Sequence, residues 1–394
     1  MGCNNWLSCF TGSNNSPGNL AATEEIATNN LRVFSYNTLR SATLNFHPAN
    51  KIGGGGFGVV YKEALTVLTW QGTLRDGTTQ VAIKTLSAES KQGTDEFKAE
   101  IRLIANTRHP NLVQLIGCCV EDGHRILVYE YLENNSLATA LLGSKGKHRA
   151  MDWPTRVAIC LGTATGLAFL HEEVEPSIVH RDIKASNILL DANLQPKIGD
   201  FGLAKLFPDN VTHVSTRVAG TMGYLAPEYA QLGKLTKKAD VYSYGVLLLE
   251  IVSGRSSSKA AFGEELLVLV EWAWKMQNEE RLLELVDPEL TNYPEHEVLR
   301  FTKVALFCTQ LAASQRPTML QVVEMLSKNV HLNDKALAEP GFYKNWTPRC
   351  SGGSRSFNES TSSGKDIRGK QPLLKPSIGS EVVSATSITQ MFPR

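Results

Sequence analysis

The hydrophobic pattern of the chain changes about a third of the way along it. Before residue 132, β-branched segments separated by turn residues predict strands over 51–61, 79–86, 112–119 and 124–132. A helix interrupts them over 97–107, because Phe97, Ile101 and Ile104 recur at spacings of four and three. Later apolar residues recur at helical spacing over 153–171, 237–253, 266–277, 297–311 and 318–326. Strands followed by helices predict an α+β protein with two lobes, the first mainly β and the second mainly α.

Both ends of the chain lack this periodicity. Residues 1–33 are rich in Asn, Ser, Thr and Gly, so we expect a flexible N-terminal arm there. Residues 329–394 are rich in Ser, Gly and Lys, which predicts a disordered tail. Between them we expect one folded domain over 34–328, which begins with a short helix capped by Ser35. Its core would span about 46–328, with the small lobe ending near residue 132.

Composition excludes several classes of protein. Lys and Arg number 40 against 39 Asp and Glu, so the whole chain has no basic footprint for a nucleic acid. The seven cysteines include no CxxC pair, which indicates free thiols in a reducing compartment. No run of about 18 apolar residues occurs, so we expect no membrane-spanning helix. We therefore expect a cytoplasmic monomer, with Cys118, Cys119, Cys160 and Cys308 buried as small apolar residues.

A glycine-rich motif, GxGxxG, is formed by Gly53, Gly55 and Gly58. Dinucleotide-binding folds use the same spacing, but there the glycines lead directly into a helix. Here the segment 57–61 is β-prone instead. This favours a hairpin whose turn lets backbone N–H groups approach phosphates, and it argues against a dinucleotide site.

A lysine ends the next predicted strand. In Val-Ala-Ile-Lys, Lys84 could be an ordinary exposed lysine, but after a glycine hairpin it can reach the α- and β-phosphates of a nucleotide. Such a lysine needs a carboxylate partner, and the following helix offers Glu96 and Glu100. We favour Glu100, because it directly precedes Ile101, which should face the core.

The most specific motif is the run HRDIKASN at 180–187, followed by Asp200-Phe201-Gly202. These residue types suit transfer of a phosphoryl group to a hydroxyl. Asp182 would accept or orient the hydroxyl proton, and Lys184 would neutralise the moving group. Asn187 and Asp200 would hold Mg²⁺.

Together these motifs resemble the signature of the eukaryotic protein kinases over roughly residues 46–328. Within kinases, the segments 128–131, 197–199 and 220–224 resemble the Pelle/IRAK group, which in plants comprises the receptor-like kinases. Because no membrane span is expected, the chain resembles a receptor-like cytoplasmic kinase, near the cold-responsive protein kinases. The resemblance implies a two-lobed kinase fold with ATP and Mg²⁺ as cofactors.

The resemblance also implies roles for individual residues. Tyr129 would be the gatekeeper behind the adenine, and the backbone of Glu130 and Leu132 would bind the adenine edge. Further contacts to ATP would come from the glycine loop, from Lys84 and from Ile52, Val60, Ala82 and Leu189. Glu228 would pair with Arg316, and Asp240 would hold the backbone of the catalytic loop.

The implied activity is that of a serine/threonine protein kinase in signalling downstream of receptors. Lys184, two places after Asp182, and Thr221 both favour serine and threonine over tyrosine. Its partners would be protein substrates and a receptor kinase or membrane complex. Arg181 could pair with a phosphate on the activation segment, where the candidate phosphosites are Ser215, Thr216 and Thr221.

The N-terminus begins Met-Gly-Cys, but Trp6 stands where a myristoylation signal has Ser or Thr. Palmitoylation of Cys3 and Cys9 could attach the arm to the inner face of the plasma membrane, although stable attachment usually takes two lipid signals. The alternative is a soluble arm with two free thiols.

One segment departs from the family pattern. Between Lys62 and Gly72 the chain carries Glu63–Gln71, an apolar, β-prone insertion. It could form a lengthened hairpin, it could displace the strand of Lys84 and weaken ATP binding, or it could be an error of the gene model. Displacement would favour a second hypothesis, a pseudokinase scaffold that binds partners without transferring phosphate.

Overall fold

The computed structural model describes residues 31–55, 58–65, 68–69, 72–73, 79–86, 91–121, 123–143, 151–208, 211–257, 269–328, 330 and 332–337. Most of the predicted arm, with Cys3 and Cys9, and the tail beyond 337 lie outside the described residues. In the part that is described, no helix is long and apolar enough to cross a membrane.

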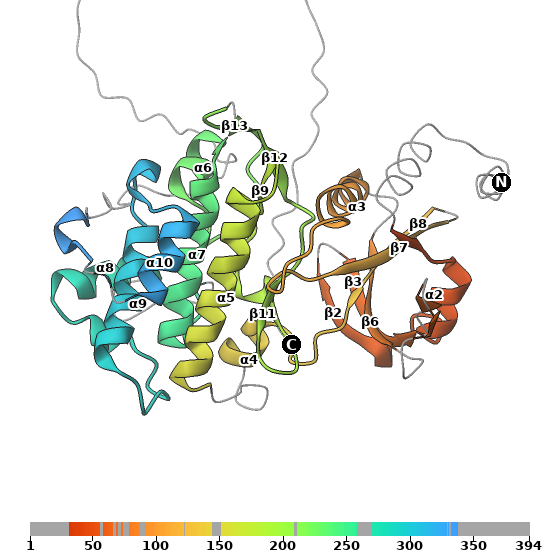
Figure 1. Cartoon of the computed structure of the whole chain (residues 1–394), viewed down its shortest axis with the longest axis horizontal. Helices are drawn as coiled ribbons and strands as arrows, with labels where there is room; N and C mark the ends of the chain where they lie inside the picture. Colours follow the sequence, from red (N-terminus) through yellow and green to blue (C-terminus); the bar gives the residue numbers. More distant parts are fainter. Residues whose placement is uncertain are drawn as a thin grey trace, which may run out of the picture. The chain divides into compact units, whose positions relative to one another are not determined.

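The N-terminal part is built on a six-stranded sheet with the order β1-β7-β8-β6-β3-β2 (Figure 1). The pair β1–β7 is parallel, and the other neighbours are antiparallel. The strands are β1 (Arg32–Val33), β2 (Lys51–Gly55), β3 (Gly58–Leu65), β6 (Thr79–Leu86), β7 (Leu115–Glu121) and β8 (His124–Glu130). The β-prone segment over 51–61 is two strands, because its glycines form the predicted hairpin.

Among the described residues, two α-helices accompany this sheet. In α2 (Tyr36–Ala42), the Ser35 hydroxyl accepts the N–H of Thr38 at 3.1 Å, and Leu39 is fully buried. Helix α3 (Lys91–Ile104) begins well before the predicted start at Phe97. Its first turns are polar, so the apolar pattern could not reveal them. The predicted face, including Phe97, is buried.

The C-terminal part is mainly helical (Figure 1). Its α-helices are α4 (Leu137–Leu142), α5 (Trp153–Glu172), α6 (Pro227–Leu232), α7 (Lys237–Ser253), α8 (Leu269–Asn278), α9 (Glu295–Cys308) and α10 (Met319–Ser327). Short pairs of strands join β9 (Ser177–Val179) to β12 (Lys205–Phe207), β10 (Ile188–Leu190) to β11 (Pro196–Ile198), and β13 (Val214–Ser215) to β14 (Lys234–Leu235). The predicted α+β, two-lobed class is confirmed.

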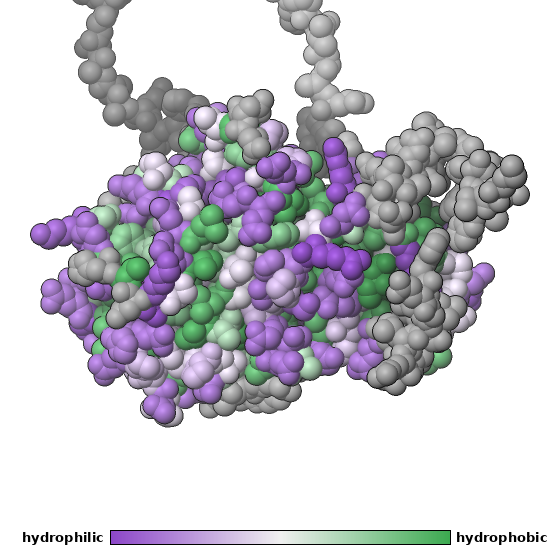
Figure 2. Space-filling model, in the orientation of Figure 1, coloured by the Kyte–Doolittle hydropathy of each residue, from purple (hydrophilic) through white to green (hydrophobic). Residues whose placement is uncertain are grey.

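Helix α7 forms the centre of this helical part. Every residue from Ala239 to Ser253 is buried, and the helix packs against α5, α8 and α9. A helix that is apolar on all sides belongs in a core. Hydrophilic side chains predominate on the face drawn in Figure 2, in keeping with apolar residues gathered inside.

The insertion lengthens a hairpin. Glu63, Ala64 and Leu65 continue β3 and pair with β6, and a separate two-stranded unit joins β4 (Leu68–Thr69) to β5 (Gly72–Thr73). The strand of Lys84 is not displaced, because Lys84 pairs with Val60 on one side and Leu127 on the other. The remaining residues of the insertion lie outside the described residues.

The four cysteines expected in the core are buried and free of disulfides. Burial raises the pKa of Cys118 and of Cys308 to about 12. These thiols therefore behave as small apolar groups and not as reactive thiolates.

A buried ion pair joins Arg156 on α5 to Asp287, which lies in the segment between α8 and α9. The side chain of Arg156, 1% exposed as a residue, lies 2.6 Å from Asp287 through Nη2 and Oδ2. Its Nη1 donates to Ile251 O at 2.9 Å and its Nε to Met151 O at 3.1 Å. Each of the three guanidinium nitrogens therefore has a partner within the protein.

We predict that Arg156→Ala lowers the free energy of unfolding by about 3–5 kcal/mol, because it leaves the Asp287 carboxylate buried without its partner. Urea unfolding of the purified chain measures this value. The matched control is Lys328→Ala, which removes an exposed pair with Glu324 and should change the free energy by less than about 1 kcal/mol. Equal effects of the two substitutions would contradict the prediction.

Candidate active site

The glycine motif forms a β-hairpin. Gly53, Gly54 and Gly55 of β2 pair with Val60, Val59 and Gly58 of β3. Gly58 has φ +122°, and a Cβ there would lie 2.2 Å from the carbonyl oxygen of Thr85. Only glycine fits this close approach. No helix follows the glycines, so the arrangement differs from that of dinucleotide-binding folds.

The Lys84 ammonium lies between two carboxylates. Its Nζ is 2.6 Å from Oε1 of Glu100 on α3 and 2.8 Å from Oδ1 of Asp200. Glu96, the other acid that the sequence offers, is buried one turn earlier and accepts a hydrogen bond from Gln92 at 2.9 Å. The structure thus joins the strand, the helix and the Asp-Phe-Gly segment through one ammonium group.

The opposite charges in this cluster stabilise the ionised forms of Lys84 and Asp200. Burial acts to lower the pKa of Lys84, but Glu100 and Asp200 outweigh it and raise that pKa. Burial likewise opposes ionisation of Asp200, but Lys84 outweighs it and lowers the pKa of this carboxyl. The Tyr129 hydroxyl donates to Oε2 of Glu100, and its pKa is raised by burial and by that carboxylate. Tyr129 therefore remains a donor at neutral pH.

A second cluster surrounds Asp182, whose residue is 3% exposed. Its Oδ2 lies 2.8 Å from Lys184 Nζ and accepts from Asn187 Nδ2 at 3.1 Å. Its Oδ1 accepts from the Thr221 hydroxyl at 2.7 Å, and Lys184 donates to the same hydroxyl at 2.8 Å. A base, a cation and a hydroxyl thus converge at one point, as transfer of a group to a hydroxyl requires.

Asp240 on α7 fixes the backbone of this loop. Its two carboxylate oxygens accept the N–H of His180 at 2.7 Å and of Arg181 at 2.8 Å, and the His171 ring lies 3.0 Å away. Burial would raise the pKa of Asp240, but the hydrogen bond from His171 and the nearby imidazoles lower it. Arg181 has φ 72°, a conformation that such bonds can maintain.

Three of the side chains expected around adenine, those of Val60, Ala82 and Tyr129, share one face of the six-stranded sheet. Ala82 pairs with Tyr129 and Val60 pairs with Lys84, and residues directly opposite in a sheet lie on the same face. Leu189 on β10 is half-buried against the core, and Ile52 on β2 is 39% exposed. Glu130 and Leu132 lie at and just beyond the end of β8.

The donor set suits Mg²⁺. Asn187 uses its Nδ2 for two bonds to Asp182, at 2.8 Å to the carbonyl and 3.1 Å to the carboxylate, so Oδ1 is the amide atom that would bind a cation. Asp200 supplies a carboxylate. Two oxygen ligands with waters and phosphates are typical of Mg²⁺, and the described residues contain no larger cluster of metal-ligating side chains.

A family model for protein tyrosine and serine/threonine kinases matches residues 46–326. The chain belongs to this protein kinase family. The resemblance predicted from the motifs is thereby confirmed.

Plant kinases are among the relatives. Cold-responsive protein kinase 1 of Arabidopsis thaliana is 51% identical over 346 residues, which cover 86% of this chain and 84% of that protein. Two probable LRR receptor-like serine/threonine-protein kinases of the same plant are 52% and 53% identical over 80% and 75% of this chain. The matched segments make up only 29% and 28% of those two proteins.

In this kinase the Ala226-Pro227-Glu228 segment is tied to the helical lobe. Both carboxylate oxygens of Glu228 lie 2.8 Å from the guanidinium of Arg316, whose side chain is fully buried. Arg316 Nε also donates to Gln310 O at 2.7 Å. Such a bidentate pair fixes both distance and orientation.

The candidate phosphosites Ser215 and Thr216 on the activation segment differ in their exposure to solvent. Ser215 lies exposed in β13, whose partner is β14. Thr216 is half-buried, and its hydroxyl accepts from Lys205 Nζ at 2.7 Å. Burial and the nearby Arg181 lower the pKa of Lys205, and no carboxylate among the described residues forms an ion pair with it. Arg181 itself donates to the carbonyl of Arg217 at 2.9 Å.

Sequence reasoning missed two buried contacts. The first is the bond from Tyr129 to Glu100. The second is Glu250, which is fully buried and accepts from the Tyr224 hydroxyl at 2.6 Å and from the Ser257 N–H at 2.7 Å. The signal for Glu250 was an isolated acid within the apolar run of α7, which indicates a buried polar partner.

Glu250 should make stability depend on pH. Burial raises its pKa from 4.5 to about 7, although the bonds from Tyr224 and Ser257 oppose the shift. Between these values the unfolded chain has lost a proton that the folded chain keeps, so stability falls as pH rises from about 4.5 to 7.

We predict that Glu250→Gln removes this pH-dependent fall in the free energy of unfolding, which is on the order of 3 kcal/mol in total. Urea unfolding at several pH values measures the difference between wild type and variant. The exposed Glu133→Gln is the control for the substitution itself. The same pH dependence in Glu250→Gln and wild type would contradict the prediction.

Proposed function

We propose that this chain is an active serine/threonine protein kinase that transfers the γ-phosphoryl group of ATP to Ser or Thr hydroxyls of proteins. The observation that carries the proposal is the double cluster of the site. Lys84 is held by Glu100 beside Asp200, and Lys184 and Asp182 share the hydroxyl of Thr221. The relatives that are named serine/threonine-protein kinases support the same class.

Each residue has a role in the proposed step. The substrate oxygen bonds to the γ-phosphorus while the bond to the bridging oxygen of ADP breaks, and the bond electrons leave with ADP. Asp182 takes the hydroxyl proton, and Lys184 offsets charge on the moving group. Lys84 would bind the α- and β-phosphates. Asn187 and Asp200 would hold Mg²⁺, which would neutralise charge on the phosphates.

The preference for Ser and Thr is supported by Thr221. Its hydroxyl donates to Asp182 and accepts from Lys184, so it fixes the base and the cation relative to each other.

The pseudokinase hypothesis depended on displacement of β6 by the insertion. Because β6 keeps Lys84 beside Glu100, we retain the active kinase.

We predict that the full chain transfers phosphate from MgATP to itself and to a generic basic protein. A chain lacking Glu63–Gln71 should show similar turnover, because the insertion leaves the pairing of Lys84 intact. Asp182→Asn should lower turnover by about 10²- to 10⁴-fold through loss of the base. Radiolabelled transfer measures these rates, with Asp200→Asn as the blank.

The matched control is Asp334→Asn, which changes the same functional group in a surface ion pair with Lys303. If the purified full chain does not exceed the blank, the proposed activity is wrong. Activity in the shortened chain alone would mean that the insertion disables this kinase.

For regulation we propose Thr216 as the principal activating phosphosite, ahead of Ser215 and Thr221. Thr216 touches Lys205 near Arg181, and a phosphate there would neutralise this basic pocket through charge-assisted hydrogen bonds. Ser215 lies exposed in the β13–β14 pair, and Thr221 is bonded to Asp182.

We predict that Thr216→Ala lowers activity severalfold, and that the double variant with Ser215→Ala is no more active. Ser215→Ala alone is the matched control and should retain most activity. Lys205→Ala should remove the advantage that phosphorylation of Thr216 gives. Turnover and mass-spectrometric phosphosite occupancy measure these effects; wild-type turnover in the double variant would refute the assignment.

We further propose a monomeric protein that acts on protein substrates within a receptor kinase or membrane complex. Attachment to the plasma membrane through Cys3 and Cys9 stays a prediction from the sequence. Metabolic labelling with a palmitate analogue tests it, with Cys3→Ser and Cys9→Ser as controls. Absence of label from both cysteines would favour the soluble arm.

A further inference from the structure

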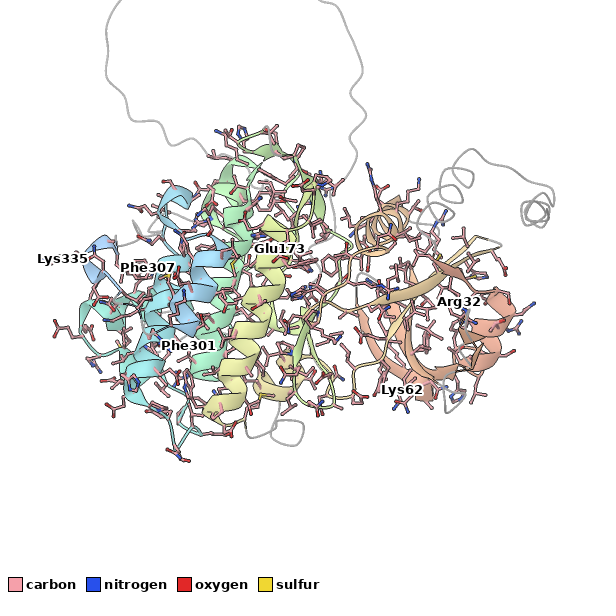
Figure 3. The ribbon with its side chains drawn as sticks, in the orientation of Figure 1. Arg32, Lys62, Glu173, Phe301, Phe307 and Lys335 are labelled. Carbon is pink, nitrogen blue, oxygen red and sulfur yellow. The ribbon has the colours of Figure 1, made fainter. Side chains whose placement is uncertain are left out.

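Lys62 lies on β3, immediately before the insertion, and is labelled in Figure 3. Its Nζ is 4.3 Å from the centroid of the Tyr131 ring. Tyr131 directly follows β8 and stands between Glu130 and Leu132, the two residues expected to bind adenine through their backbone. The contact therefore joins the strand that returns from the glycine hairpin to the segment linking the two lobes.

The register of the sheet places Lys62 on the nucleotide side. Lys62 pairs with Ala82, and Val60 pairs with Lys84. Directly opposite residues share a face, as do residues two apart in one strand. Lys62 therefore belongs to the same face as Val60, Ala82 and Lys84, at the end of the row away from the phosphate-binding lysine.

The chemistry of the pair suits a specific contact. An ammonium within about 6 Å of a ring centroid is attracted by the negative face of the ring. Both residues are half-buried, so water screens the attraction less than at an open surface. An ordinary exposed lysine at a strand end would point into solvent instead.

The other side of the linking segment has its own anchor. Glu130 Oε1 accepts the N–H of Gln114 at 2.8 Å and lies 3.0 Å from Nζ of Lys197. These partners belong to other elements than β3. Loss of the contact between Lys62 and Tyr131 should therefore loosen β3 relative to residues 130–132, where adenine is expected to bind, without releasing Glu130.

We propose that Lys62 and Tyr131 are positioning residues for the nucleotide. Their cation–π contact fixes β3 against the backbone of residues 130–132, so the slot for adenine keeps its width before ATP enters. This inference rests on the proposed function, because it assumes that the slot binds ATP.

The test is a double-mutant cycle on the full chain. Lys62→Met removes the charge at similar length, and Tyr131→Leu removes the ring. Each should weaken binding of MgATP about two- to fivefold, the effect of one partly exposed cation–π contact. The double variant should bind MgATP no more weakly than the single variant with the lower affinity, because each substitution removes the same contact. Calorimetry measures the affinity, and steady-state kinetics should show a raised KM for ATP with kcat within about twofold.

Conservative variants separate this role from a merely structural one. Lys62→Arg keeps a cation, and Tyr131→Phe keeps the ring face, so both should retain wild-type affinity for MgATP. Additive effects in the cycle, or a Tyr131→Phe variant as weak as Tyr131→Leu, would overturn the inference while wild-type phosphotransfer still supports the proposed function. If the wild-type chain binds no MgATP, both fail together.

Discussion

The site depends first on the Lys84 ammonium between two carboxylates, those of the fully buried Glu100 and the half-buried Asp200. Each neighbour comes from a different element: Glu100 from α3 and Asp200 from the segment after β11. A buried cation is stable only with such partners, and the carboxylates are in turn stabilised by it. The sheet, the helix and the metal-binding segment are therefore interdependent. The bond from Tyr129 to Glu100 adds β8 to the same unit.

The second constraint is the buried helix α7. It supplies Asp240, which accepts two N–H groups of the catalytic loop, and Glu250, which accepts from Tyr224 near the other end of the helix. Both acids come from a helix whose remaining residues are mostly apolar. One rigid, buried helix thus positions both the loop of Asp182 and the segment of Tyr224. The packing of the core therefore also orients the site.

Much of the site could be predicted because its residues follow local motifs with fixed offsets. The sequence favours Glu100 over Glu96 because Glu100 directly precedes Ile101, which faces the core, and the structure places Glu100 beside Lys84. The polar first turns of α3 were missed, because periodicity depends on apolar residues. The bond from Tyr129 to Glu100 and the contact between Lys205 and Thr216 could not be predicted, because each joins elements whose approach only the tertiary fold decides.

The insertion shows why an irregular sequence can leave a site intact. Its first residues extend the β3–β6 ladder at the end away from Lys84, so every pair between Val59 and Lys62 keeps its register. A one-residue slip would have moved all of these side chains to the opposite face. Additional length costs little, roughly 0.6 kcal/mol for each doubling of a loop, whereas loss of register would separate Lys84 from both carboxylates. Register, more than length, therefore decides whether an insertion in this hairpin is compatible with the site.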